Sequence, residues 1–147
     1  MEIAGTVSAL LSDKTRALRS IQPTATVFAA IELMAGENIG ALPVMEGARL
    51  VGIISERDYT RKVILQGRSS RETPVSQIMT RDPQTVSPND SIGQCMRLMT
   101  EQRARHLPVV ENGALVGILS IGDVVKWVIS AQTATIDQLT KYVYGEM

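Results

Sequence analysis

Aromatic side chains are scarce in this sequence and make up 3 % of its 147 residues. The core must therefore come from aliphatic residues and methionine, within an apolar fraction of 44 %. Proteins that bind single-stranded nucleic acid usually stack the bases on aromatic rings. A DNA-binding domain normally carries excess positive charge, whereas the formal net charge here is zero. We therefore expect no nucleic-acid partner.

Cysteine and histidine each occur once, as Cys95 and His106. A lone cysteine excludes an intramolecular disulfide and a multi-cysteine zinc site, and a lone histidine excludes a histidine-rich metal site. Apolar runs stay well short of the roughly 20 residues that span a bilayer. The start of the chain also lacks the basic and apolar regions of a signal peptide. We therefore expect a cytoplasmic location, no membrane partner and no protein-held metal.

The sequence contains an internal repeat with an offset of 65 residues. Leu42-Pro43-Val44 recurs as Leu107-Pro108-Val109, and residues 50–53 recur as residues 115–118. Between 21–64 and 86–129, 15 of 44 aligned positions are identical without a gap, where chance would give about three. The chain is therefore a tandem duplication of a unit of about 60 residues.

Each copy shows the same order of expected elements. An extended lead-in precedes a helix whose apolar residues recur at helical spacing, and two short strands with a turn and a second helix follow. In the first copy these elements are expected at 19–22, 26–37, 41–45, 50–54 and from Ser55; in the second they are expected at 85–87, 90–103, 106–110, 115–119 and from Ser120.

The expected fold class is α/β of the α+β type. A three-stranded sheet covered on one face by two helices leaves its other face bare, and two copies can bury those faces on each other. We expect two β-α-β-β-α units, packed sheet to sheet with pseudo-twofold symmetry. The expected organisation is an N-terminal helical extension (1–14), a first unit (15–66), a linker (67–79), a second unit (80–130) and a C-terminal helix (131–147).

The repeated segments resemble a known signature. Residues 40–44 with 50–58 resemble the cystathionine-β-synthase (CBS) domain, and residues 106–110 with 115–123 resemble it again. The segment Ile78-Met79-Thr80 resembles the usual lead-in to a second CBS unit. The resemblance covers about residues 13–130. The sequence is similar to small stand-alone bacterial CBS pairs whose suggested role is signal transduction.

This resemblance implies a Bateman module that binds an adenosine-containing ligand in the cleft between its two units. AMP, ADP, ATP, NAD(H) and S-adenosylmethionine are the ligands known for such modules. The implied function is a regulatory sensor, without catalytic residues, that signals to a separate partner protein of unknown identity. A homodimer is expected, and Mg²⁺ only as a companion of the nucleotide phosphates.

The pattern Ser-x-x-Asp ends the second strand of each copy. The resemblance implies that Asp58 and Asp123 accept hydrogen bonds from the ribose hydroxyls, a role that suits a carboxylate with two acceptor oxygens. Ser55 and Ser120 then lie at a helix N-terminus, which favours a phosphate. The same pattern is also a capping box that stabilises a helix without any ligand. The two roles can coexist.

The two copies differ in their cationic residues. Arg57 stands where the second copy has Gly122, whereas Arg105 and His106 stand where the first copy has Gly40 and Ala41. By the resemblance these positions line the phosphate end of each site, so the two sites are expected to differ in phosphate preference. Arginine is a bidentate phosphate ligand. The nearby cations are interpreted instead as parts of solvated helix faces: Arg61, Lys62 and Arg103.

The remaining predicted site residues come from the resemblance. Thr15 and Thr80, which precede each unit, are expected to reach the nucleotide, and Gly40 is expected to let it approach the backbone. The adenine is expected among aliphatic residues of both copies, namely Ile39, Ala41, Pro43, Ile54, Val86, Leu107, Pro108 and Leu119.

Two other kinds of function are considered. An enzyme is disfavoured, because the sequence has neither a nucleophile–base pair nor a glycine-rich phosphate loop. A ligand-free dimerisation or scaffold domain remains the alternative to a sensor. Cys95 aligns with Ala30 on the expected buried stripe, so it is interpreted as a small core residue rather than a redox centre.

Overall fold

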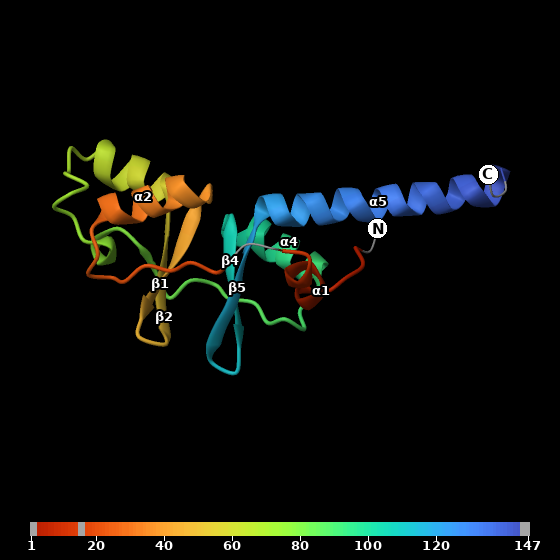
Figure 1. The fold of residues 1–147 in the computed structure, drawn as a ribbon, viewed down its shortest axis with the longest axis horizontal. Helices are drawn as coiled ribbons and strands as arrows, with labels where there is room; N and C mark the ends of the chain where they lie inside the picture. Colours follow the sequence, from red (N-terminus) through yellow and green to blue (C-terminus); the bar gives the residue numbers. More distant parts are fainter. Residues whose placement is uncertain (1–2, 15–16, 145–147) are drawn as a thin grey trace. The chain divides into compact units, whose positions relative to one another are not determined.

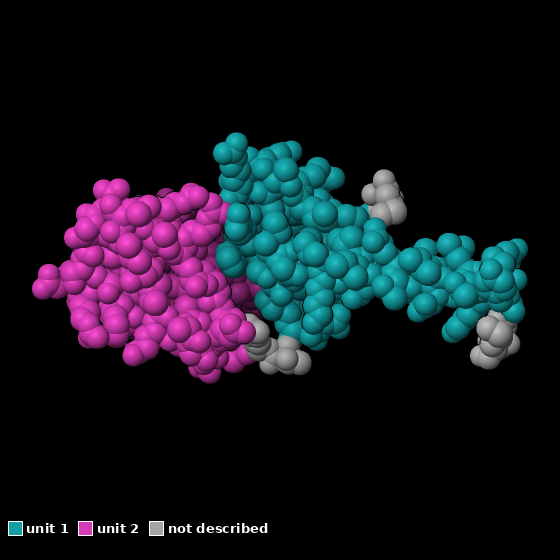
Figure 2. All heavy atoms as spheres, turned by 90° about the horizontal axis from the view of Figure 1, so that it is seen from above, with its two compact units in different colours: residues 1–15, 86–107, 119–147 teal, residues 16–85, 108–118 magenta. Residues whose placement is uncertain are grey.

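The computed structural model describes residues 3–14 and 17–144. It contains helices and two small antiparallel sheets, as expected for the α+β class. The chain divides into two compact units (Figure 2), each built from segments that are distant in sequence. Unit 1 comprises residues 1–15, 86–107 and 119–147, and unit 2 comprises residues 16–85 and 108–118.

The first helix of each repeat lies close to its predicted position. Helix α2 (Val27–Glu37) is capped by Thr26, and helix α4 (Ile92–Gln102) is capped by Ser91. The helix was expected to open at Asp90, whereas it begins at Ile92 with Ser91 as its cap. Ser91 Oγ accepts from the Gln94 N–H (3.1 Å), which makes Ser91 the cap.

The sheet of unit 2 has the order β1-β2-β3. Strands β1 (Ala41–Glu46) and β2 (Arg49–Ser55) form the predicted hairpin, with Leu42 opposite Ile54. The short strand β3 (Thr80–Arg81) pairs with β2 on its other side. Instead of a full strand, the predicted lead-in at 19–22 forms one parallel bridge, between Ile21 and Val44.

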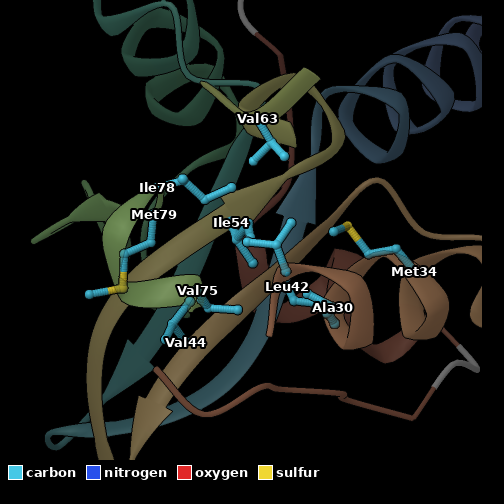
Figure 3. Close-up of a cluster of buried hydrophobic side chains, with 10 residues drawn as sticks. Ala30, Met34, Leu42, Val44, Ile54, Val63, Val75, Ile78 and Met79 are labelled. Atoms are coloured by element: carbon cyan, nitrogen blue, oxygen red, sulfur yellow. The ribbon is translucent and has the colours of Figure 1, made fainter. Parts of the chain in front are cut away.

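The core of unit 2 lies between α2 and the sheet (Figure 3). Helix α2 contributes Ala30 and Met34, and the two long strands contribute Leu42, Val44 and Ile54. All five side chains are buried. The core therefore contains no aromatic ring among its buried members, as the composition predicts. The other buried members are Val27, Val63, Val75, Ile78 and Met79.

The second helix of the first repeat is irregular. Helix α3 (Glu56–Tyr59) begins at Ser55 as predicted, and it is followed directly by a π-helical turn, η1 (Thr60–Ile64). The Leu65 N–H donates to the Thr60 carbonyl (3.1 Å), five residues back. Within η1, Val63 is buried. A π turn adds a residue to the helix and shifts the side chains that follow.

Unit 1 is assembled around α4 and the first turns of helix α5 (Ile121–Tyr144). The predicted N-terminal helix is present as α1 (Val7–Ser12) and buries Val7 and Leu10. The segment before it pairs with the start of α4, since the Val7 N–H donates to the Asp90 carbonyl (2.9 Å). Figure 1 shows α1, α4 and the start of α5 side by side.

The second repeat also has its predicted hairpin, formed by β4 (His106–Glu111) and β5 (Ala114–Ser120). Cys95 and Ala30, which the repeat aligns, are both fully buried. Burial raises the pKa of the Cys95 thiol to about 11. Cys95 is therefore a buried core residue, and its thiol is protonated near neutral pH.

The two helices expected at the end of the chain form one continuous helix. Residues 131–144 continue α5 without interruption, so one helix of 24 residues replaces two predicted helices (Figure 1). The physical reason is that no glycine or proline follows Gly122 before Tyr144. The far end of α5 extends beyond the rest of unit 1 (Figure 2).

Candidate ligand-binding site

Both Ser-x-x-Asp segments form the same capping geometry. In unit 2, the Ser55 N–H donates to Asp58 Oδ2 (2.9 Å), and the Asp58 N–H donates to Ser55 Oγ (3.2 Å). In unit 1, the matching distances at Ser120 and Asp123 are 2.8 Å and 3.0 Å. Each carboxylate is therefore fixed at the start of a helix by hydrogen bonds that need no ligand.

The strand that precedes each hairpin turn is tied to the same helix start. The Glu56 N–H donates to the Gly40 carbonyl (3.0 Å), and the Ile121 N–H donates to the Arg105 carbonyl (2.9 Å). These bonds join equivalent positions of the repeat. They hold the residues that precede Leu-Pro-Val beside the Ser-x-x-Asp turn in both copies.

The carboxylate of Asp58 is paired with a lysine on its own helix. Lys62 Nζ lies 3.0 Å from Asp58 Oδ1 and donates to the Ile78 carbonyl (2.9 Å). The Ser55 hydroxyl contacts the other carboxylate oxygen (3.0 Å). Lys62 is exposed, as the interpretation of a solvated helix face requires, and it also holds the Asp58 carboxylate. This lysine ties the site to the segment before β3.

The carboxylate of Asp123 is paired with a lysine from the far end of the sequence. Lys14 Nζ lies 2.8 Å from Asp123 Oδ2, the same oxygen that accepts from the Ser120 N–H. Burial raises the pKa of Asp123, but hydrogen bonds from Lys14 and Ser120 outweigh it, and the net shift is downward. Asp123 is therefore ionised near neutral pH.

Sequence reasoning missed Lys14. The repeat aligns Lys14 with Met79, which is not a cation, so the alignment contained no sign of its role. The ion pair depends on the packing of the N-terminal segment against unit 1. The spacing of four residues between Asp58 and Lys62 is one that allows a helical ion pair, whereas no local spacing points to a partner 109 residues away.

His106 lies close to this ion pair. Burial lowers the pKa of His106, and the nearby Lys14 and Arg105 lower it further, whereas Asp123 acts in the opposite direction. The imidazole is therefore neutral near pH 7. A phosphate placed beside it would favour its charged form.

The predicted site residues fall into two groups, one in each unit. Unit 2 holds the set from the first repeat: Ile39, Gly40, Ala41, Pro43, Ile54, Ser55, Arg57 and Asp58, with Thr80 and Pro108. Unit 1 holds the set from the second repeat: Val86, Arg105, His106, Leu107, Leu119, Ser120, Gly122 and Asp123. Thr15 lies outside the described residues.

Exposure separates these residues by chemical type. Arg57, Arg105, Gly122 and Thr80 are exposed to solvent. The aliphatic positions are all buried or partly buried. Four of them have almost no exposed surface. Those four are Ala41, Ile54, Leu107 and Leu119.

Metal binding has no visible basis within residues 3–14 and 17–144. No group of three or more His, Cys, Asp or Glu side chains there is arranged to hold a metal ion.

A shallow hollow of unit 2 is lined by hairpin-turn residues, including Ala48, Arg49 and Gly113, and by none of the predicted site residues. None of the helices in the described ranges is long and apolar enough to cross a membrane.

Comparison with protein-family models identifies the domain that each repeat forms. The model of the CBS domain matches residues 8–64 and again residues 75–130. The chain belongs to the CBS domain family. Its two repeats are thus two CBS domains, and together they form a small CBS pair, as the signature residues predict.

Curated CBS proteins resemble the chain over most of its length. The mitochondrial CBS domain-containing protein CBSX3 of Arabidopsis thaliana is 43 % identical over 125 residues, which are 82 % of this chain and 61 % of that protein. The chain thus spans about three fifths of this relative. YhcV of Bacillus subtilis is 34 % identical over 80 % of this chain and 83 % of YhcV.

Solved CBS structures share the fold. A protein from Burkholderia ambifaria, whose suggested role is signal transduction, matches with a TM-score of 0.84 and 48 % identity, over 87 % of this chain and 96 % of that one. CBSX2 in complex with AMP matches with a TM-score of 0.72 and 28 % identity, over 88 % of this chain and 99 % of CBSX2. CBS pairs thus include proteins that bind AMP.

Proposed function

We propose that this CBS pair is a regulatory module that binds an adenine nucleotide and passes the change to a partner protein. AMP, ADP, ATP and NAD(H) are the proposed ligands, and the chain is not proposed to be an enzyme. The observation that carries the proposal is the carboxylate at the strand-to-helix turn, built twice with the same hydrogen bonds. The complex of CBSX2 with AMP supports the ligand class.

The chemistry of each turn suits a nucleotide. The carboxylate oxygens of Asp58 and Asp123 are acceptors for the two ribose hydroxyls. Arg57 on one turn, and Arg105 with His106 on the other, supply donors for phosphate. Buried aliphatic side chains such as Ile54 and Leu119 lie on the strands that lead to these turns.

Nucleotide binding must alter the ion pair that each carboxylate forms with a lysine. Lys62 and Lys14 neutralise the two carboxylates in the ligand-free chain. A ribose hydroxyl has to share the carboxylate with the ammonium group or displace it. The released ammonium is then available to a phosphate, so the cation that holds the site at rest becomes a ligand contact.

A calorimetric titration tests the proposal. AMP, ADP, ATP, NAD⁺ and S-adenosylmethionine are each added to the full chain. We expect at least one of the adenine nucleotides to bind with a Kd below about 1 mM, or about −4 kcal/mol. Failure of all five to bind would contradict the sensor function.

The second candidate function is a ligand-free scaffold. It is favoured by the capping boxes and ion pairs, which stabilise each turn without any ligand. The titration distinguishes the two functions, because a scaffold binds none of the nucleotides.

In either case we propose a homodimer and a cytoplasmic location. One relative, CBSX3, is mitochondrial.

A further inference from the structure

Helix α5 carries a row of exposed aliphatic side chains along most of its length. The most exposed lie beyond the part that packs on unit 1: Ile136 is 61 % exposed, Leu139 59 % and Val143 67 %. Val125 and Ile129 continue the row toward the helix start, at 49 % and 57 %. So much apolar surface on one helix indicates a partner.

The spacing of this row is that of a coiled coil. Starting at Val125, steps of four and three residues lead through Ile129, Gln132, Ile136 and Leu139 to Val143. These are alternating d and a positions of a heptad repeat. We call them the α5 seam: Val125, Ile129, Gln132, Ile136, Leu139 and Val143.

The rest of unit 1 packs on the opposite side of the helix. In the same heptads Val124 is a c position and Trp127 an f position, both turned away from a and d. Val124 is buried, and the Trp127 indole N–H donates to the Ala4 carbonyl (2.9 Å). The α5 seam therefore faces away from the contacts that hold α5 in place.

The residue types of the seam favour a parallel dimer. The a positions Ile129, Ile136 and Val143 are β-branched, and Leu139 occupies a d position, a combination typical of two parallel strands. The polar Gln132, at a d position, is compatible with such a pair. In a parallel, in-register pair it meets its own copy, and its amide both donates and accepts.

The charges are compatible with self-pairing. The e and g positions that flank the seam from Val128 to Tyr142 are threonine or apolar, so two identical helices bring no like charges together there. Asp137 and Lys141 lie at b and f positions, outside the interface. A membrane surface is a poorer partner, since α5 offers only Lys126 and Lys141 as basic residues.

We infer that the α5 seam pairs with the same seam of a second copy, as a parallel, in-register, two-stranded coiled coil. This interface is independent of nucleotide binding. It uses none of the residues at the Ser55 and Ser120 turns. At 1.5 Å per residue, the seam is about 27 Å long.

Sedimentation velocity of the full chain tests the inference. We expect the wild type to dimerise and Ile136→Asp, at an a position, to weaken dimerisation by about tenfold or more. Ala134→Asp is the matched control, because Ala134 is exposed at an f position of the same helix. It should leave the dimer intact, and Gln132→Leu should tighten it. Circular dichroism checks that the variants remain folded.

Several results would overturn the inference. A wild-type chain that stays monomeric up to about millimolar concentration has no such interface. A dimer that Ile136→Asp leaves unchanged uses another surface. Flotation of the wild type with anionic vesicles, lost in Ile136→Asp, would assign the seam to a membrane. Nucleotide affinity, measured in parallel on the same variants, should not change, so the two proposals fail separately.

Discussion

At the scale of single residues, each proposed site contains a carboxylate with two structural roles. Asp58 and Asp123 cap a helix through Ser55 and Ser120 and form an ion pair with a lysine. The capping bond to each carboxylate uses one of its two oxygens, Oδ2. The proposed ribose contact therefore adds to a group that the fold already holds in one orientation, which lowers the entropic cost of binding.

The Lys14 contact makes a prediction about His106. Burial is the main cause of the lowered pKa of His106, and Lys14 adds to it, so Lys14→Gln should shift this pKa upward. NMR titration of the imidazole measures it directly, because the sequence has one histidine. Lys141→Gln, on the distant part of α5, is the matched control for the loss of one positive charge. An unchanged His106 pKa in Lys14→Gln would contradict the proximity.

The lowered pKa of His106 also affects stability. Below pH about 6.5 the unfolded chain binds the proton more readily than the folded chain. His106 therefore lowers the free energy of unfolding as the pH falls from about 7 toward 5. Asp123 acts at lower pH, where its stabilising contribution is lost as its carboxylate is protonated.

Nucleotide affinity should depend on pH in the second site. A phosphate beside His106 favours the imidazolium, so binding takes up a proton and becomes tighter as the pH falls from about 8 to 6. Lys14, Arg105 and Asp123 are the charged groups around His106, and the last of these favours protonation too. Calorimetry at several pH values measures the slope. A slope that persists in His106→Gln would place the titrating group elsewhere.

At the scale of elements, Gly52 allows β3 to reach β2. A Cβ on Gly52 would lie 2.6 Å from Met79 Sδ and 2.8 Å from the Thr80 carbonyl oxygen. Because the second atom belongs to the backbone, the clash is not relieved by rotating a side chain. Gly52 is therefore required for the segment that carries Thr80 to pack beside the first repeat.

Replacement by alanine should have opposite effects on stability at Gly52 and at Gly36. Gly52→Ala should lower the free energy of unfolding by about 1–3 kcal/mol, as overpacking does. Gly36 is the matched control: it lies in α2 with no atom within 4 Å of an added Cβ. Gly36→Ala should stabilise the chain by about 1 kcal/mol through helix propensity. Urea denaturation measures both, and an equal response would refute the close approach.

The repeat predicts most elements but not their exceptions. Both hairpins and the helix starts at Thr26 and Ser55 follow from apolar spacing and capping residues. The strand β3 was missed because it consists of two residues whose pairing depends on a long-range contact. The length of α5 was missed because the repeat ends near residue 129, although the residues that follow favour a helix.

At the scale of the whole molecule, the proposed functions lie on different surfaces. The Ser55 and Ser120 turns are proposed to bind nucleotides, and the α5 seam is proposed to bind a second copy. The residues of the two surfaces do not overlap, so a variant of one leaves the chemistry of the other intact. A nucleotide changes assembly only through differential affinity for two states of the chain.

Sequence motifs led to the proposed site residues but not to the ion pairs that the two aspartates form. The CBS signature led directly to both Ser-x-x-Asp turns and to Arg57, Arg105 and His106. Their ligand contacts remain predictions. Neither lysine that neutralises the carboxylates was identified, because Lys14 acts across the chain and Lys62 also resembles an ordinary solvated helix residue.

Counting nucleotides per chain in aspartate variants tests the central claim most directly. Asp58→Asn and Asp123→Asn are titrated calorimetrically with the nucleotide that binds the wild type. Asp90→Asn is the control, because Asp90 accepts from the Ser87 N–H (2.8 Å) in a similar turn outside the proposed sites. We predict that the wild type and the control bind two nucleotides and that each site variant loses one, since a lost bond to a charged group weakens binding by about 10- to 100-fold. Unchanged stoichiometry and affinity in both site variants would contradict the account.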